Sequence, residues 1–265
     1  MCPSCELMSN FAANLTFLWN EYPFLERFEH AARAGFRGVE FHFPYDTDYY
    51  DIKVRLDAYQ LTPVLHNLAV GDTTKGEFGL ACLPGREADF RVTVDAAIDY
   101  ARGLGTPRCN CLVGNKPADI ARREIEAVLI TNLRCAGREF ANAGLELMVE
   151  PLNHIDMPNF TLNTAAETIG ILDQVGLENI KLQYDFYHMA MMGDDIANSL
   201  PRLLPRIGHI QFADAPGRHE PGTGRIDMSA LFVQLDKLKY DGWVAAEYRP
   251  SGLTNDSLAW FNPLK

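Results

Sequence analysis

The stretch Leu145–Tyr187, LELMVEPLNHIDMPNFTLNTAAETIGILDQVGLENIKLQYDFY, contains one complete strand–helix–strand unit. Its two ends, Leu145–Pro151 and Ile180–Tyr187, are short runs rich in apolar residues, which is typical of buried parallel strands. Between them, Thr164–Val175 has the apolar spacing of a helix, with a threonine at its start and Gly176 directly after it. A connection of this length joins parallel strands, so the stretch predicts a βαβ unit.

The same alternation continues in both directions along the chain. Eight strands are predicted, at Phe11–Leu15, Gly38–Pro44, Pro63–Asn67, Arg108–Val113, Leu145–Pro151, Ile180–Tyr187, Ile207–Ala213 and Trp243–Tyr248. Eight helical segments alternate with them, at Pro23–Ala34, Asp48–Tyr59, Glu87–Gly103, Asp119–Asn142, Thr164–Val175, Asp194–Leu204, Met228–Lys237 and Asn255–Trp260. Capping residues stand at several of their ends: Asp119, Thr164 and Asp194 at the start, and Gly35, Gly105, Gly144 and Gly176 after the end.

The chain length fits this repeat. Dividing 265 residues by eight gives about 33 per unit, which is the size of one strand, one helix and two loops. We therefore predict an α/β fold with one closed (β/α)₈ TIM barrel as a single domain over residues 1–265, of which residues 1–9 form a flexible extension. An open doubly wound sheet is the structural alternative, but the chain has neither a Gly-x-Gly-x-x-Gly turn after an early strand nor a Walker-type loop.

The composition excludes several classes of partner. The chain carries 24 Lys and Arg against 35 Asp and Glu, a net charge of −11, and no basic run, which argues against binding nucleic acid. No apolar stretch approaches the ~20 residues that cross a bilayer, and the N-terminus lacks the layout of a signal peptide. We expect no membrane partner and a cytoplasmic location; the sequence is compatible with a homo-oligomer.

The cysteines are too sparse for a disulfide scaffold. Six occur in 265 residues, so Cys82, Cys109, Cys111 and Cys135 are interpreted as buried free thiols. The Cys2-x-x-Cys5 pair has half of a zinc-knuckle spacing, but no second pair lies near it.

Polar residues end the last four predicted strands. Glu150, Asp185, Gln211 and Glu247 occupy this place on strands five to eight. The C-terminal ends of barrel strands converge on one rim, so these groups are expected to face one point. Three carboxylates there repel one another unless a cation compensates, which predicts a divalent metal, and oxygen ligands favour Mg²⁺ or Mn²⁺ over zinc. The alternative is that each acid pairs separately with a Lys or Arg on the rim.

Several motifs spread over nearly the whole chain resemble the hydroxypyruvate isomerase family. They are Phe36-Arg-Gly-Val-Glu-Phe, Leu65-His-Asn, Cys111-Leu-Val-Gly, Glu150-Pro-Leu-Asn-His, Gln183-Tyr-Asp-Phe-Tyr-His, Gly208-His-Ile-Gln, Glu220-Pro-Gly-Thr-Gly and Gly242-Trp-Val-Ala-Ala-Glu-Tyr. The resemblance implies a xylose isomerase-like barrel in which Glu150, Asp185, Gln211 and Glu247 are metal ligands. It also implies that Glu150 and Glu247 transfer the proton between hydroxypyruvate and tartronate semialdehyde.

The resemblance leaves the substrate open. The 2-oxo-tetronate isomerases are similar over the same motifs and act on an acid with one carbon more. Apurinic endonucleases share the barrel, but they hold several metals through additional histidines, and Gln211 stands where a nitrogen ligand would be expected. A 1,2-hydride shift is the alternative mechanism, and a barrel that binds a sugar acid without turnover is a third hypothesis.

An anionic substrate beside acidic ligands needs donors for its carboxylate. Arg86, Arg218 and Arg249 are candidates, because each stands in a loop expected at the rim. Arg86 ends the Gly-rich segment Leu68–Arg86, which could act as a lid or be an ordinary surface loop.

Two histidines near strand ends are candidates for binding the oxygens of an enediolate. His66 ends the third predicted strand, and His188 follows Asp185 by three residues. Glu40, at the end of the second strand, is predicted to orient His66. The alternative for each histidine is a satisfied residue of the core.

Overall fold

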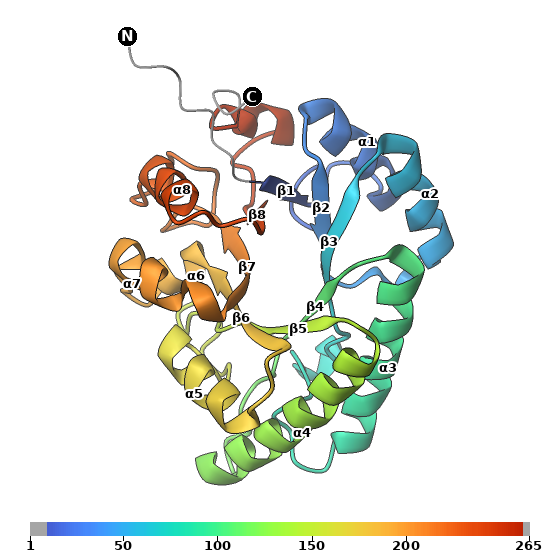
Figure 1. The fold of residues 1–265 in the computed structure, drawn as a ribbon, viewed down its shortest axis with the longest axis vertical. Helices are drawn as coiled ribbons and strands as arrows, with labels where there is room; N and C mark the ends of the chain where they lie inside the picture. The colour runs from blue at the N-terminus through green and yellow to red at the C-terminus, as the bar shows by residue number, and fades with distance from the viewer. Residues whose placement is uncertain (1–9, 262–265) are drawn as a thin grey trace.

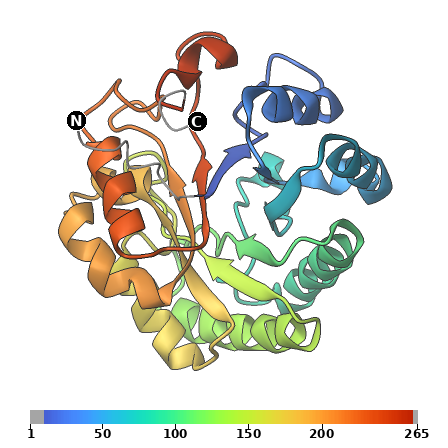
Figure 2. The ribbon, with the colours of Figure 1, turned by 45° about the horizontal axis from the view of Figure 1, so that its top comes forward.

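The computed structural model describes residues 10–261, which form a closed barrel of eight parallel strands surrounded by helices (Figures 1 and 2). The strands are β1 Asn10–Asn14, β2 Gly38–Phe41, β3 Thr62–Asn67, β4 Arg108–Cys111, β5 Glu146–Val149, β6 Ile180–Asp185, β7 Ile207–Phe212 and β8 Trp243–Ala246. β8 pairs with β1 as well as with β7, so the sheet has no free edge. The predicted barrel is confirmed, and the open sheet is excluded. No helix in this part of the chain is long and apolar enough to cross a bilayer.

The helices largely occupy the predicted segments. They are α1 Phe24–Ala34, α2 Tyr49–Tyr59, α3 Glu87–Leu104, α4 Arg122–Asn142, α5 Ala165–Val175, α6 Phe186–Met191, α7 Ile196–Leu203 and α8 Met228–Lys237. Short 3₁₀ helices are η1 Pro44–Asp46, η2 Thr73–Lys75, η3 Leu204–Arg206 and η4 Thr254–Leu258. The predicted final helix Asn255–Trp260 corresponds to η4 and to the turn after it. Helix α6 was not predicted, and it takes up the end of the predicted sixth strand.

The capping predictions are partly confirmed. Thr164 caps α5 by accepting from the backbone N–H of Glu167, whereas Asp119 lies three residues before α4 and does not cap it. Asp195 caps α7 in place of Asp194, because the Asp194 carboxylate is hydrogen-bonded to Tyr184 and Ser199. Gly35, Gly105 and Gly176 are confirmed as C-caps in the left-handed conformation, at the ends of α1, α3 and α5 respectively. Gly144, also in the left-handed region, stands one residue beyond the cap of α4.

Side chains alternate along the strands between the barrel interior and the surrounding helices. A small apolar layer lies inside the barrel and consists of Ala12, Val64, Leu65, Met148 and Ala245. Two larger apolar clusters pack on the outward-facing residues of the strands, such as Ile210 and Val149. Closer to the C-terminal ends, the inward positions become polar and remain buried: Asn14, Glu40, Asn110, Gln183, His209 and Gln211. The sequence therefore places a polar layer inside the barrel directly below its upper rim.

The segment between β3 and α3 is anchored to the β4–α4 loop. The backbone N–H of Cys82 donates to the carbonyl oxygen of Val113 in that loop. Within the segment, the backbone N–H of Gly79 donates to the carbonyl oxygen of Val70. Gly79 has a φ of +119°, and a Cβ built on it would lie 2.0 Å from the carbonyl oxygen of Leu112. This close backbone approach holds Phe78 of the same segment against the mouth of the barrel.

Replacing Gly79 by alanine is therefore expected to destabilise the protein by about 3 kcal/mol or more, because the new methyl group meets backbone and the left-handed conformation is strained. Gly85→Ala is the matched control: its φ is +83°, but its Cβ would meet nothing within 4 Å, so about 1 kcal/mol is expected. Urea denaturation of both variants checks the difference. Equal losses would contradict the close approach.

Four cysteines within residues 10–261 are free thiols. Cys82, Cys109 and Cys111 are buried, as predicted, but Cys135 is exposed on α4, so the prediction of burial was wrong there. Cys135 does not lie on the buried apolar face of α4. Cys2 and Cys5 lie outside the described residues.

Candidate active site

A cavity of about 650 Å³ opens at the C-terminal ends of the strands. Its polar lining includes Glu150, His188, Arg218, Glu247 and Arg249. Its walls are largely aromatic and aliphatic and include Phe17, Phe43, Phe78, Leu112, Leu152, Met157, Tyr187 and Met191. An apolar enclosure with a few convergent polar groups is the usual form of a site for a small molecule.

The four residues predicted from the strand ends lie close together: Glu150 and Glu247 line the cavity, whereas Gln211 contacts Glu247 and Asp185 contacts Arg218 without lining it. Glu150 and Glu247 directly follow β5 and β8, Asp185 ends β6, and Gln211 belongs to β7. All four are buried. Two amides connect the two glutamates: Gln183 Nε2 donates to Glu150 Oε2 at 3.0 Å and to Gln211 Oε1 at 2.6 Å, and Gln211 Nε2 donates to Glu247 Oε1 at 3.2 Å.

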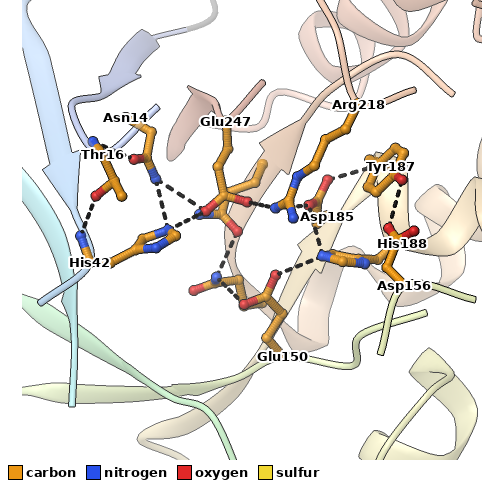
Figure 3. Close-up of polar contacts among 12 residues, drawn as sticks. Asn14, Thr16, His42, Glu150, Asp156, Asp185, Tyr187, His188, Arg218 and Glu247 are labelled. Atoms are coloured by element: carbon orange, nitrogen blue, oxygen red, sulfur yellow. Dashed lines mark hydrogen bonds and ion pairs between the residues drawn. The ribbon is translucent and has the colours of Figure 1, made fainter. Parts of the chain in front are cut away.

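Glu247 accepts hydrogen bonds at both carboxylate oxygens (Figure 3). At Oε1 the donors are His42 Nε2 at 2.6 Å and Asn14 Nδ2 at 3.1 Å, in addition to Gln211. At Oε2 the donor is the guanidinium of Arg218. Burial acts to raise the pKa of Glu247, but Arg218 and then His42 outweigh it and hold the pKa at about 2.

Glu150 and Asp185 have fewer donors. Both hydrogen bonds to Glu150, from Asn110 Nδ2 at 2.8 Å and from Gln183, reach Oε2. Burial, followed by the charges of Glu247 and Asp185, raises the pKa of Glu150 well above its ordinary value. Burial likewise raises the pKa of Asp185 to about 8. Arg218 opposes the rise at both carboxyl groups, so their positive compensation is present but incomplete.

The arrangement fits a divalent cation. Oδ2 of Asp185 is buried and has no hydrogen-bond partner within residues 10–261. Glu150, Asp185 and His188 each offer a ligand atom, and these atoms lie within 4.8 Å of one another. Glu247 adjoins this group, because Arg218 Nη2 contacts both its Oε2 and, at 3.6 Å, Asp185 Oδ2.

His188 is better suited to donate a hydrogen bond than to bind a metal. Its Nδ1 lies 3.1 Å from the backbone N–H of Asn153, which can only donate, so Nδ1 is the acceptor. The proton of the neutral imidazole is then on Nε2, which points between Asp185 Oδ2 at 3.7 Å and Glu150 Oε1 at 3.9 Å (Figure 3). Burial and Arg218 lower the pKa of His188 to about 3. The carboxylate and amide oxygens therefore remain the natural ligand set.

Glu40 does not contact His66, contrary to prediction. It lies inside the barrel, where it accepts from His209 Nε2 at 2.6 Å, Gln211 Nε2 at 2.7 Å and Asn14 Nδ2 at 2.8 Å. The side chain of His66 points outward from β3, with its ring Nε2 3.4 Å from the thiol of Cys109 and near Tyr45 and Tyr100. Burial lowers the pKa of His66 to about 4. The structure thus places His66 in the core between the sheet and the helices, outside the cavity lining.

The three candidate arginines separate into different roles. Arg218 lies inside the site, where it pairs with Glu247 and its guanidinium lies 4.9 Å from the ring centre of Phe17. Arg249 lines the cavity mouth, 5.8 Å from the same ring, and its guanidinium makes no ion pair within residues 10–261. Arg86 is not brought to the cavity, because its guanidinium pairs with Glu77 and Asp89.

A buried carboxylate organises the loop that carries Arg218. Asp214 accepts four backbone N–H groups: Ala215 and Ile226 at Oδ1, and Gly222 and Gly224 at Oδ2, with distances from 2.8 to 3.0 Å. One side chain therefore closes the loop between β7 and α8, which positions Arg218 over the site.

The contacts of His42, Gln183 and His209 were not predicted from the sequence. A two-residue period could have found all three: His42 follows Glu40 by two, Gln183 precedes Asp185 by two, and His209 precedes Gln211 by two. Residues two apart on a strand face the same side of the sheet. The rule fails for His66, because β3 has a register shift at Val64, and both Val64 and Leu65 belong to the inner layer.

Comparison with known proteins agrees with this geometry. The family model described as "Xylose isomerase-like TIM barrel" matches residues 28–264. The chain is 46% identical to hydroxypyruvate isomerase of Escherichia coli, covering 97% of this chain and 100% of that one. It is 44% identical to 2-oxo-tetronate isomerase of Cupriavidus necator over 97% and 98% of the two chains. A crystal structure from Brucella melitensis, titled AP endonuclease, family 2, superposes with a TM-score of 0.94 at 41% identity and covers 97% of this chain and 99% of that one. The eight-stranded barrel, the site at its rim and these full-length similarities together show that the chain is an isomerase of the xylose isomerase-like TIM barrel family.

Proposed function

We propose that this protein is a metal-assisted isomerase that interconverts hydroxypyruvate and tartronate semialdehyde, with Glu150 and Glu247 as the proton-transferring pair. One observation carries the proposal: the two buried glutamates are connected through the amides of Gln183 and Gln211 beneath one cavity. Moving a proton between neighbouring carbons needs an acceptor for one carbon and a donor for the other.

Four side chains of this set would hold the cation: Glu150, Asp185, Gln211 and Glu247. Their oxygen atoms suit Mg²⁺ or Mn²⁺. Such a cation would supply positive charge beside the two substrate oxygens, which acidifies the adjacent C–H bond and stabilises the enediolate.

The remaining groups bind and orient the substrate. One glutamate removes a proton from the carbon that carries the hydroxyl group, and a proton is returned to the carbon that carried the carbonyl. The hydroxyl proton moves to the former carbonyl oxygen, so the reaction needs no oxidant or reductant. His188 Nε2–H is placed to donate to a substrate oxygen, and Arg249 is free to bind the substrate carboxylate. Arg218 balances part of the charge of Glu247 and Asp185.

A four-carbon substrate is the second candidate. The cavity of about 650 Å³ has room for a chain one carbon longer, and the similarity to the Cupriavidus necator 2-oxo-tetronate isomerase is nearly as high as that to the hydroxypyruvate isomerase. The two reactions use the same proton transfer, so they differ in how the cavity walls fit the substrate.

The test compares kcat/KM for hydroxypyruvate and for 2-oxo-tetronates at equal concentration, after metal removal with a chelator and reconstitution with Mg²⁺ or Mn²⁺. We expect turnover to be lost on chelation and restored by either cation, with the higher value for hydroxypyruvate. In deuterated water, deuterium should enter the substrate carbon. Turnover without deuterium uptake would favour a hydride shift, and incision of abasic DNA without turnover of either acid would favour the endonuclease alternative.

A further inference from the structure

We propose that His42 is a positioning residue that holds the Glu247 carboxylate in its reactive orientation. The inference rests on the proposed function, in which Glu247 transfers a proton. His42 follows β2 on the opposite side of Glu247 from Arg218 (Figure 3). Its ring lines the cavity, and 17% of its side chain is exposed, whereas the Glu247 side chain is 3% exposed.

The hydrogen-bond pattern defines which ring nitrogen acts. His42 Nε2 lies 2.6 Å from Glu247 Oε1, and an ionised carboxylate can only accept, so Nε2 carries the proton. Asn14 Nδ2 is 3.3 Å from the same nitrogen and 3.1 Å from Oε1. Two donors from the ends of β1 and β2 therefore converge on one carboxylate oxygen.

His42 is itself held in place by the end of β1. Its backbone N–H donates to Thr16 Oγ1 at 2.8 Å, and the backbone N–H of Thr16 donates to Asn14 Oδ1 at 3.0 Å. The ring packs edge-on against Phe17, with ring centres 5.4 Å apart. Because both the backbone and the ring are fixed, the imidazole can impose a direction on Glu247 rather than follow it.

This direction matters because Arg218 attracts the other carboxylate oxygen. Arg218 also contacts Asp185. Without His42, only the longer hydrogen bonds from Asn14 and Gln211 hold Oε1, so the Glu247 carboxylate can rotate toward the arginine and away from the substrate. A proton acceptor displaced by even a fraction of an ångström loses rate, while substrate binding at Arg249 is little affected. We therefore assign His42 an effect on kcat more than on KM.

The test uses two substitutions that differ in where they place a donor. The amide nitrogen in His42→Gln reaches about as far as Nε2, whereas that in His42→Asn reaches only as far as Nδ1. We expect His42→Asn to lower kcat by about 10- to 100-fold with KM nearly unchanged, and His42→Gln to retain most of the activity. His30→Asn is the control, because His30 belongs to the outer helix α1 and its ring stacks on that of Tyr22. Melting temperatures verify folding.

Binding of Mn²⁺ provides a readout that does not depend on turnover. If His42 orients Glu247, His42→Asn should also weaken Mn²⁺ binding, measured by calorimetry, more than His42→Gln does. Equal activity and equal Mn²⁺ affinity in both variants, whether both normal or both impaired, would overturn the inference. A wild-type protein that turns over neither acid would refute the proposed function, and the Mn²⁺ comparison would still decide the role of His42.

Discussion

Glu247→Gln is expected to lower kcat by about 10³-fold with hydroxypyruvate or with a 2-oxo-tetronate as substrate. This factor is within the range for loss of a positioned general acid or base. The amide oxygen can still accept from His42 and Asn14, so the side chain should remain in place. The NH₂ group of the glutamine, however, would face the Arg218 guanidinium. An amide cannot accept a proton from carbon, so the variant lacks the base. Glu150→Gln should cause a loss of similar size, because both steps of the transfer need a carboxyl group.

Glu146→Gln is the matched control on β5, the strand that Glu150 directly follows. Glu146 starts β5 at the opposite end of the barrel, where it pairs with Lys181, and its side chain is 32% exposed. Isomerisation and deuterium incorporation should be measured for all three variants. Full activity in either Glu247→Gln or Glu150→Gln would show that the residue is not part of the proton-transferring pair.

Arg249→Met is expected to raise KM and to lower kcat/KM by about 100-fold with a small change in kcat. A charge-assisted hydrogen bond to a carboxylate contributes about 1.5–3 kcal/mol, which corresponds to a factor of about 10 to 150, and the expected loss lies within this range. Arg218 is already paired with Glu247 and Asp185, whereas Arg249 stands at the cavity mouth without an ion pair in the described part of the chain. The effect should therefore appear in binding.

Two further arginine substitutions sharpen this experiment. Arg206→Met is the control, because Arg206 pairs with Asp173 just before β7, at the far end of the barrel. Arg86→Met tests the assignment that the sequence suggested, and the structure predicts no comparable rise in KM because Arg86 pairs with Glu77 and Asp89. A larger rise for Arg86→Met than for Arg249→Met would restore Arg86 as the carboxylate ligand.

The regular elements of the barrel could be predicted because each strand is a short apolar run, and each run is followed by a segment whose apolar residues have helical spacing. The strand ends were less predictable. Asp185 both ends β6 and caps α6 by accepting from the N–H of Tyr187, and the aromatic residues after it suit a strand as well as a helix. The placement of Glu150, Asp185, Gln211 and Glu247 followed from topology alone, since parallel strands bring their ends to one rim.

The partners of these groups were harder to infer, because contacts across the barrel depend on register. Glu40 and His209 lie 169 residues apart, and Glu247 and His42 lie 205 apart. Loop residues were harder still: Arg86 and Arg249 both follow strand segments, and only three-dimensional packing shows that one is paired and the other lines the cavity. The two-residue period would have placed His42 inward, but the register shift at Val64 hides the outward direction of His66.

Asp214 has a consequence for the exchange of amide protons with solvent. The N–H groups of Gly222 and Gly224 belong to a surface loop, yet both donate to one buried carboxylate. They can exchange only when that carboxylate releases the loop, so we expect protection close to that of the barrel strands. The neighbouring amide of Thr223 bonds the carbonyl of Glu220 at 3.3 Å and should exchange faster. Protection that alternates along three consecutive residues would mark this loop as a unit that opens and closes through a single side chain.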